Sequence, residues 1–169
     1  MSIRRAGDDD VREIAEIHVR SWRAAYRSIL PSALLEGLSV TEREGSWRPI
    51  VRGGGEAWLT LVAERDKQLL GFCSVATPSQ DPSAGERTAE VGALYVDPGS
   101  WRKGAGRAMM SVALKDLREQ GLREVFLWVL PENLAALDFY RRLGFELQPG
   151  VEKREERSGH QVIQLRMGL

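Results

Sequence analysis

The residues best suited to bind a charged ligand lie between a predicted strand and a predicted helix. Gly104 and Gly106 let the backbone approach a ligand closely. Arg102, Lys103 and Arg107 add positive charge around the same point, and the N–H groups at the start of a helix attract phosphate. The segment therefore predicts either a pyrophosphate-binding turn or a plain helix start after a turn.

Two other phosphate-binding motifs do not fit this segment. A Walker loop requires GxxxxGK followed by Ser or Thr, and the sequence contains no such string. The dinucleotide-binding fingerprint needs a third glycine at the position of Met109. The sequence therefore lacks the residues that a binder of nucleotide phosphates usually has.

Hydrophobic periodicity predicts the elements that position the glycine turn. Helices are predicted at residues 10–26, 32–38, 41–47, 104–120 and 133–143, with Ser32 as a cap of the second and a glycine-rich break at 52–55. Strands are predicted at 58–64, 69–77, 89–96 and 125–130, followed by a hairpin that pairs 145–156 with 161–167. Hairpins on either side of a strand–helix–strand unit predict a mixed α/β fold with a mixed sheet.

Length and composition limit the classes of function. With 169 residues, the chain is expected to form one domain over 1–169. The formal net charge is zero, which argues against a general nucleic-acid binder. The single cysteine, Cys73, excludes an intrachain disulfide and a Cys-rich metal site. The sequence has no apolar run long enough to span a membrane and no targeting segment, so we expect a cytoplasmic protein without a membrane partner.

The glycine turn resembles motif A of the GNAT superfamily of N-acetyltransferases, which reads Q/R-x-x-G-x-G/A. Gly104 and Gly106 match the motif, whereas Trp101 stands where the family has Gln or Arg. That difference concerns only a side-chain contact, because the glycines present backbone N–H groups. The strand VFLWVL, followed by Asn133 and the string AALDFYRRLGFE with Tyr140, resembles motif B. The string EIHVRSWRAAYRSILP is similar to the first two helices of bacterial members.

This resemblance implies a fold and a reaction. The GNAT fold has a central mixed, mostly antiparallel twisted sheet of about seven strands flanked by about four helices, and here its first strand would lie near Ser2–Arg5. The family moves an acetyl group from acetyl-CoA, without a metal, directly to a primary amine of a small molecule or a protein. Homodimers are common in the family, and nucleic acid is not an expected partner.

The resemblance also implies roles for individual residues. Glu90 would take the proton from the amine, commonly through water, although it could equally be a surface carboxylate of a half-exposed strand. Backbone N–H groups at Leu94, Tyr95 and Val96 would hold the thioester oxygen and the pantetheine arm, unless they pair in an ordinary sheet. Tyr140 would donate a proton to the leaving thiolate, although its spacing also fits a core tyrosine.

The remaining residues complete the two predicted binding sites. The predicted cofactor-binding set adds Arg102, Lys103, Gly104, Ala105, Gly106, Arg107 and Asn133. Asn133 could also cap its helix. Trp22, Tyr26 and Trp47 are predicted to line the acceptor site, whereas His18 is expected to be packed rather than catalytic. A second function stays open, that of a non-catalytic acyl-CoA binding or sensing module in which Glu90 and Tyr140 serve packing alone.

Overall fold

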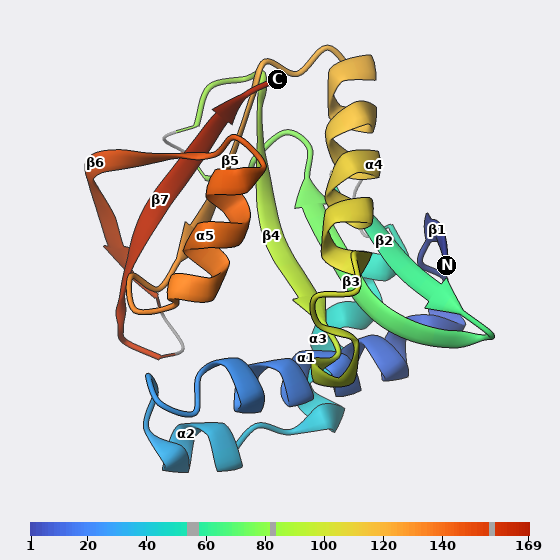
Figure 1. Cartoon of the computed structure of the whole chain (residues 1–169). Helices are drawn as coiled ribbons and strands as arrows, with labels where there is room; N and C mark the ends of the chain where they lie inside the picture. Colours follow the sequence, from blue (N-terminus) through green and yellow to red (C-terminus); the bar gives the residue numbers. More distant parts are fainter. Residues whose placement is uncertain (54–57, 82–83, 156–157) are drawn as a thin grey trace.

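The computed structural model describes residues 1–53, 58–81, 84–155 and 158–169 (Figure 1). The strands are β1 (Ser2–Arg5), β2 (Trp58–Arg65), β3 (Gln68–Ala76), β4 (Thr88–Val96), β5 (Glu124–Val129), β6 (Glu146–Arg154) and β7 (Gln161–Gly168). The helices are α1 (Val11–Ala25), α2 (Ser32–Glu36), α3 (Val40–Val51), α4 (Ala105–Glu119) and α5 (Leu134–Arg142), with short 3-10 turns η1 (Asp8–Asp10) and η2 (Pro98–Ser100).

The strands form one seven-stranded sheet in the order β1-β2-β3-β4-β5-β7-β6. Only the β4–β5 pair is parallel, and the other neighbouring pairs are antiparallel. The prediction of a mixed, mostly antiparallel sheet is therefore confirmed. The described residues contain five α-helices, where about four were expected, because the helix predicted at 41–47 forms the separate α3.

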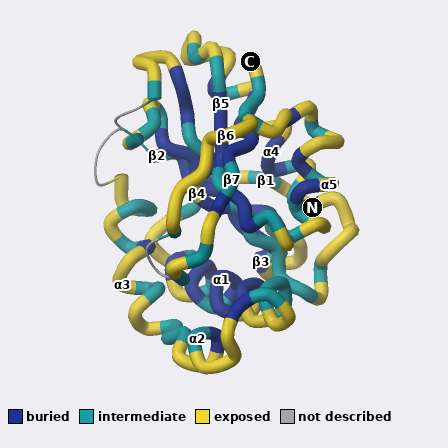
Figure 2. The backbone as a smooth tube through the Cα atoms, turned by 90° about the vertical axis from the view of Figure 1, so that its left-hand side faces the viewer, coloured by how far each residue is buried: buried dark blue, intermediate teal, exposed yellow. Residues whose placement is uncertain are grey.

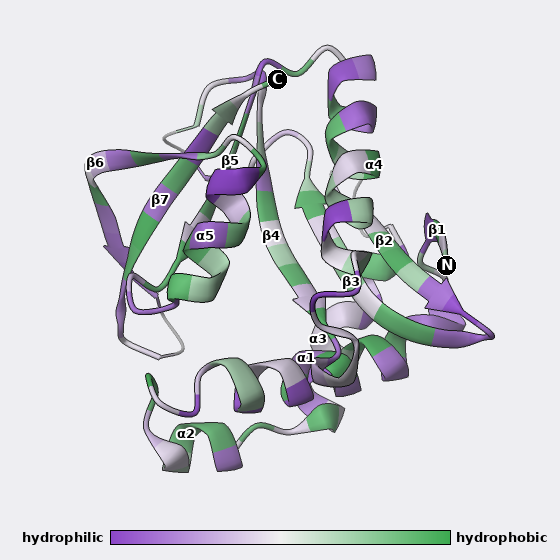
Figure 3. Cartoon of the chain, viewed as in Figure 1, coloured by the Kyte–Doolittle hydropathy of each residue, from purple (hydrophilic) through white to green (hydrophobic). Residues whose placement is uncertain are grey.

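Local signals explain where the elements begin and end. Asp66 and Lys67 have φ angles of 51° and 64°, as a two-residue hairpin turn requires, and this polar tip is purple in Figure 3. The Ser39 hydroxyl accepts a hydrogen bond from the Glu42 N–H at the start of α3. The predicted cap of α2 was wrong: Pro31 occupies the cap position, and Ser32 is the first helical residue. The structure describes the predicted glycine-rich break and the predicted final hairpin only in part. Residues 54–55 of the break and residue 156 of the hairpin lie outside the described residues.

The two faces of the sheet carry separate cores. Residues of α4 and α5 pack on one face, among them Met109, Leu117 and Leu137. Residues of α1 and α3 pack on the other face, among them Ile14 and Trp47. Figure 2 shows that burial is deepest along the central strands and α1, while β6 is exposed over almost its whole length. Of the helices described here, none has the length and apolar character needed to cross a bilayer.

Candidate active site

The parallel strands β4 and β5 separate in the middle of the sheet. They pair from Thr88 to Val91 of β4, and within the described residues the pairing goes no further. On its other side, β4 stays paired with β3 as far as Val96. The backbone edge of Leu94, Tyr95 and Val96 therefore faces an opening rather than a neighbouring strand. The expected separation of these strands is confirmed, whereas binding of pantetheine to this edge stays a prediction.

A β-bulge lies where the two strands part. Ser74 of β3 pairs with Ala93, and Val75 pairs with Val91, so Gly92 has no partner residue on β3. A bulge changes which side of the sheet the following side chains face. Here it turns Ala93 toward the α1–α3 core, whereas Val91 packs in the α4–α5 core.

The bulge decides which side chains share a face with Glu90. Ala89 and Val91 belong to the α4–α5 core, so the Glu90 side chain points to the opposite face. Tyr95, five residues along, packs against the α1–α3 core and so lies on the same face as Glu90. Strict alternation without the bulge would put these two side chains on opposite faces.

Glu90 is half-buried and has one hydrogen-bonded neighbour on the loop after β3. Its Oε2 accepts a hydrogen bond from the Ser79 hydroxyl at 3.1 Å. Burial raises the pKa of the Glu90 carboxyl, while the Ser79 bond and the charge of Lys153 act in the opposite direction and Asp81 adds to the rise. A carboxylate with a raised pKa is a better proton acceptor than an ordinary glutamate.

Tyr140 is buried on the opposite face, with its ring edge-on to Phe145 at 5.6 Å. Among the described residues its hydroxyl has no hydrogen-bond partner. Burial raises the pKa of Tyr140 well above its ordinary value, and the Cys73 thiol and the hydroxyls of Tyr26 and Tyr95 add to the rise. The three tyrosines of the chain thus come from α1, β4 and α5 to the region where β4 and β5 separate.

Asn133 has the capping role that the sequence allowed. Its Oδ1 accepts a hydrogen bond from the Ala136 N–H at 3.2 Å, which caps α5. Its side chain also lies against the hydroxyl of Tyr26, whose pKa is raised by burial. Contact of Asn133 with acetyl-CoA stays a prediction.

The glycine turn leads directly into α4. Gly104 has a φ of +88° and occupies the cap position, so the N–H groups of the first turn begin at Ala105. Ala105, the first residue of the helix, is buried. Arg102 and Arg107 are exposed beside the turn.

Trp101, which stands where the family has Gln or Arg, makes a hydrogen bond within the turn. Its indole Nε1 donates a hydrogen bond of 2.7 Å to the carbonyl of Val96, the last residue of β4. Lys103 is also tied to the loop, because its Nζ donates to the Gly99 carbonyl at 2.7 Å. These two side chains connect the end of β4 to the start of α4, and Trp101 is a structural residue of the loop.

Replacing Gly104 by alanine is expected to lower the free energy of unfolding by about 1 kcal/mol, because an L residue is strained at this positive φ. Gly45→Ala in the exposed interior of α3 is the matched control, since nothing lies within 4 Å of its added Cβ. It should raise the stability by about 0.5–1 kcal/mol. Urea denaturation measures both, and a stabilised Gly104→Ala variant would contradict the strained turn.

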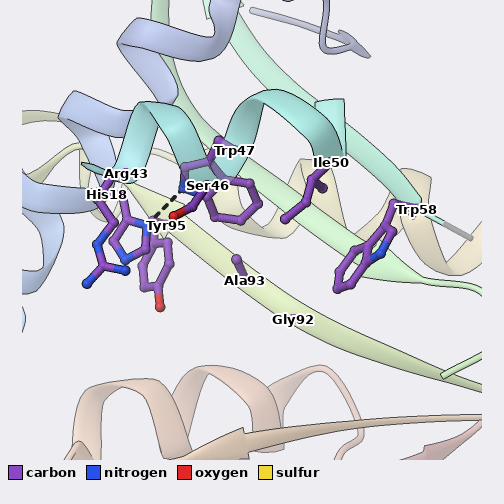
Figure 4. Close-up of a pocket in the computed structure, with 9 residues that line it drawn as sticks. All are labelled: His18, Arg43, Ser46, Trp47, Ile50, Trp58, Gly92, Ala93 and Tyr95. Carbon is purple, nitrogen blue, oxygen red and sulfur yellow. Dashed lines mark hydrogen bonds between the residues drawn. The ribbon is translucent and has the colours of Figure 1, made fainter. Parts of the chain in front are cut away.

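A pocket of about 170 Å³ lies on the Glu90 face of the sheet (Figure 4). Figure 4 shows that side chains from α1, α3 and β2 surround the bulged stretch of β4. The lining consists of His18, Arg43, Ser46, Trp47, Ile50, Trp58, Gly92, Ala93 and Tyr95. Of the predicted acceptor residues, Trp47 lines the pocket. Trp22 and Tyr26 lie beside it, in a neighbouring core cluster.

His18 is a packed residue, as expected, and it backs one wall of the pocket. The Trp47 Nε1 donates a hydrogen bond to its Nδ1 at 3.0 Å, and its ring stacks on Tyr95 at 4.8 Å. Because Nδ1 accepts this bond, the proton of the neutral ring is on Nε2. The sequence reasoning missed Trp58 and Arg43 as lining residues. Alternation along β2 puts Trp58 opposite the buried Leu59, but nothing in the sequence shows that this face borders a pocket.

The family is decided by comparison with known proteins. Residues 11–145 match the model of the acetyltransferase (GNAT) family. The chain belongs to the GNAT family. It is an acetyl-CoA-dependent N-acyltransferase. Among the described residues, no cluster of three or more His, Cys, Asp or Glu side chains could hold a metal ion.

The chain is similar to two proteins that are named as acetyltransferases. This GNAT chain is 31% identical to the uncharacterized N-acetyltransferase YuaI of Bacillus subtilis over 142 residues, which is 83% of this chain and 78% of that protein. It is 43% identical over 89 residues to a mycothiol acetyltransferase of Cellulomonas flavigena, covering 50% of this chain. The matched part is only 26% of that longer relative.

Solved structures share the fold over nearly the whole chain. The PaiA N-acetyltransferase of Thermoplasma acidophilum, in complex with coenzyme A, matches with a TM-score of 0.81 at 21% identity and covers 99% of this chain and 98% of that one. An acetyltransferase of Salmonella typhimurium with acetyl-CoA has a TM-score of 0.73 at 19% identity, with 99% and 93% covered. At these identities the likeness concerns the fold.

Proposed function

We propose that this GNAT enzyme transfers the acetyl group to a primary amine of a small molecule, with Glu90 and Tyr140 handling the two protons. The observation that carries the proposal is the opening between β4 and β5, which begins directly after Val91, one residue from Glu90. Tyr140 packs in the core of one face and Tyr95 against that of the other, yet Tyr95 affects the pKa of Tyr140. Tyr140 and Tyr95 are thus close enough to interact electrostatically, although their rings pack on opposite faces of the sheet.

The residues around the opening fit a CoA thioester. The unpaired edge of β4 at Leu94 to Val96 supplies backbone N–H groups, which can stabilise the negative charge that develops on the thioester oxygen. The first turn of α4 supplies N–H groups for phosphate, and no atom lies within 4 Å of the place of a Cβ on Gly104. Arg102 and Arg107 would add charge for the pyrophosphate.

In the proposed reaction Glu90 accepts a proton from the acceptor ammonium, so that the neutral amine can attack the acetyl carbonyl. The C–N bond forms, the C–S bond breaks, and the sulfur leaves as a thiolate. Tyr140, whose hydroxyl has no hydrogen-bond partner among the described residues, donates a proton to that sulfur. The second proton that the nitrogen loses as the amide forms restores the Tyr140 hydroxyl. The products are the N-acetylated amine and CoA.

The shape of the acceptor side supports a small molecule rather than a protein. The pocket beside the bulge is small and mostly walled by side chains of α1, α3, β2 and β4. A basic peptide would instead need a broad acidic groove. The mycothiol acetyltransferase of Cellulomonas flavigena matches 50% of this chain. This similarity supports the acetyl-transfer chemistry and does not identify the acceptor.

Release of CoA from acetyl-CoA, followed by thiol detection, tests this function. The acceptor panel contains polyamines, amino acids, aminoglycosides, arylalkylamines and basic or N-terminal peptides. We expect release that depends on a small amine. Binding of acetyl-CoA without release for any amine would contradict the proposal and favour the non-catalytic module, and release with peptides alone would refute the small-molecule acceptor. A single domain over 1–169, a cytoplasmic location and a homodimer stay predictions.

A further inference from the structure

We propose that the pocket beside Gly92 receives a single ring of the acceptor, so that the substrate class is a small primary amine that carries one aromatic ring on a short arm. This inference rests on the proposed function, since it assigns the non-reacting part of the same acceptor. The pocket lies on the Glu90 face of β4, and Gly92 is two residues from Glu90.

The volume of the pocket matches one ring. A cavity of about 150 Å³ in another protein is large enough to bind benzene. The pocket beside Gly92 has about 170 Å³. A six-membered ring therefore fits, whereas a fused three-ring system or a folded polyamine chain is too large.

The walls are aromatic and firmly held. Trp47 is 7% exposed and is fixed by its hydrogen bond to His18, which in turn stacks on Tyr95. Trp58 closes the opposite side, from β2 (Figure 4). Aromatic walls of this kind bind another ring by edge-to-face or offset contacts.

Aromatic walls can also attract a cation, but here the protein supplies one. The Arg43 guanidinium lines the pocket and lies 5.8 Å from the centre of the Trp22 ring. A second cation from a polyamine would meet this positive charge at short range. The wall chemistry therefore favours an uncharged ring over a second ammonium group.

The direction of β4 sets the length of the arm. Two residues of a regular strand span about 7 Å, and because the bulge lies at Gly92 this is the upper limit for the separation of the Glu90 backbone from the pocket floor at Gly92. Part of that distance is covered by the Glu90 side chain, and an arm of about two carbons covers the rest. A ring in the pocket then brings the amine of 2-phenylethylamine to the carboxylate.

The contact between Trp58 and Gly92 allows the proposed ring pocket to be tested by substitution of these two residues. A Cβ on residue 92 would lie 3.0 Å and 3.1 Å from two atoms of the Trp58 ring. Gly92→Ala therefore requires the indole to shift by a few tenths of an ångström, which alters the space for a ring. Trp58→Phe removes the outer part of the indole, so it should relieve the contact in the double variant.

The first experiment measures binding of 2-phenylethylamine and of ethylamine, its ringless counterpart, to the whole chain with CoA by titration calorimetry. We expect 2-phenylethylamine to bind at least about tenfold more tightly. Trp58→Ala should weaken its binding about tenfold and leave ethylamine unchanged. The exposed Val112→Ala on α4 is the control and should change neither. Equal binding of the two amines, or an unchanged ring preference in Trp58→Ala, would overturn the inference.

The second experiment uses the Gly92–Trp58 pair. Gly92→Ala should weaken 2-phenylethylamine binding several-fold, and Trp58→Phe in the same chain should restore part of it, which gives a coupling that independent sites lack. If the effects of the two substitutions on the binding of 2-phenylethylamine are additive, the contact between Gly92 and Trp58 is not the source of ring selection. If the ring amine binds as expected but no CoA is released, the proposed function fails while the ring pocket stands. If ethylamine or spermidine is acetylated more efficiently than 2-phenylethylamine, the ring pocket fails while the function stands.

Discussion

The Tyr140→Phe variant should bind acetyl-CoA with an unchanged Kd and turn over roughly 10²–10⁴-fold more slowly than the native enzyme. The substitution removes one hydroxyl oxygen and leaves the ring, which packs edge-on to Phe145. Because the hydroxyl has no hydrogen-bond partner among the described residues, its removal breaks no bond within the described part of the fold. The free energy of unfolding should therefore change by less than about 1 kcal/mol.

The raised pKa of Tyr140 defines how the hydroxyl can act. Burial raises the pKa of the phenol well above its ordinary value, so the hydroxyl is protonated at pH 7. A thiol has an ordinary pKa near ~8.5, so complete transfer of the proton to the thiolate is uphill. A fall in kcat of only about tenfold would indicate a hydrogen bond to the leaving sulfur rather than proton transfer.

Steady-state kinetics and calorimetry with CoA measure these effects. Arg142→Ala, two residues further along the same helix, removes an exposed ion pair with Asp138 and should leave kcat unchanged. An unchanged kcat in Tyr140→Phe would remove the catalytic role. A parallel loss of stability and CoA binding would show that Tyr140 serves packing.

Glu90→Gln is expected to lower kcat/KM at pH 7 by roughly 10²–10⁴-fold, because an amide cannot accept the proton of the acceptor ammonium. The amide oxygen can still accept the hydrogen bond of 3.1 Å from the Ser79 hydroxyl. Local structure should therefore be retained. Glu119→Gln is the matched control, since that carboxylate is exposed at the end of α4, where it pairs with Lys115, and should have no effect.

The pH dependence gives an independent check of Glu90. The carboxyl works only when it is ionised, and burial raises its pKa above the ordinary value of 4.5. The native enzyme should therefore lose kcat/KM as the pH falls through the raised pKa. Glu90→Gln should lack this acidic limb, and an identical limb in both proteins would refute the assignment.

The raised pKa of Glu90 also determines whether ionisation of this carboxyl stabilises or destabilises the folded state. A carboxyl whose pKa is raised by folding binds its proton more tightly in the folded state. Its ionisation therefore disfavours folding above the raised pKa, and this penalty vanishes as the pH falls below the unfolded value. Because Gln carries no charge, Glu90→Gln should be at least as stable as the native chain at pH 7. A large loss of stability would indicate a structural role.

Much of the architecture could be predicted from local patterns. The glycine turn and the helix α4 lie where the local patterns indicated, because helical spacing and glycine each act over a few neighbouring residues. The first strand lies where the resemblance to the GNAT family placed it. The Asn133 cap was predicted for the same reason, since the bond to Ala136 spans three residues. The cap of α2 was predicted wrongly, because Pro31 rather than Ser32 occupies that position.

The acceptor side depends on contacts between distant segments. Trp47 reaches the pocket only because α3 packs on α1, where its indole finds His18, 29 residues away in the chain. Trp58 has no sequence signal for its place, because its contact with Gly92 joins β2 to β4 across the intervening β3. Packing of these distant segments, rather than local preference, created the pocket.

The sequence by itself determined the order of the elements, indicated the family through its motifs, and predicts which residues carry the chemistry. Only the tertiary structure decided that Glu90 and Tyr95 share a face. Their spacing of five residues is odd, and strict alternation separates them. The bulge at Gly92 reverses the alternation, because the partner strand β3 pairs Ser74 with Ala93 and Val75 with Val91. A Cβ at position 92 would press against the Trp58 ring, and that contact forms only when the sheet is assembled.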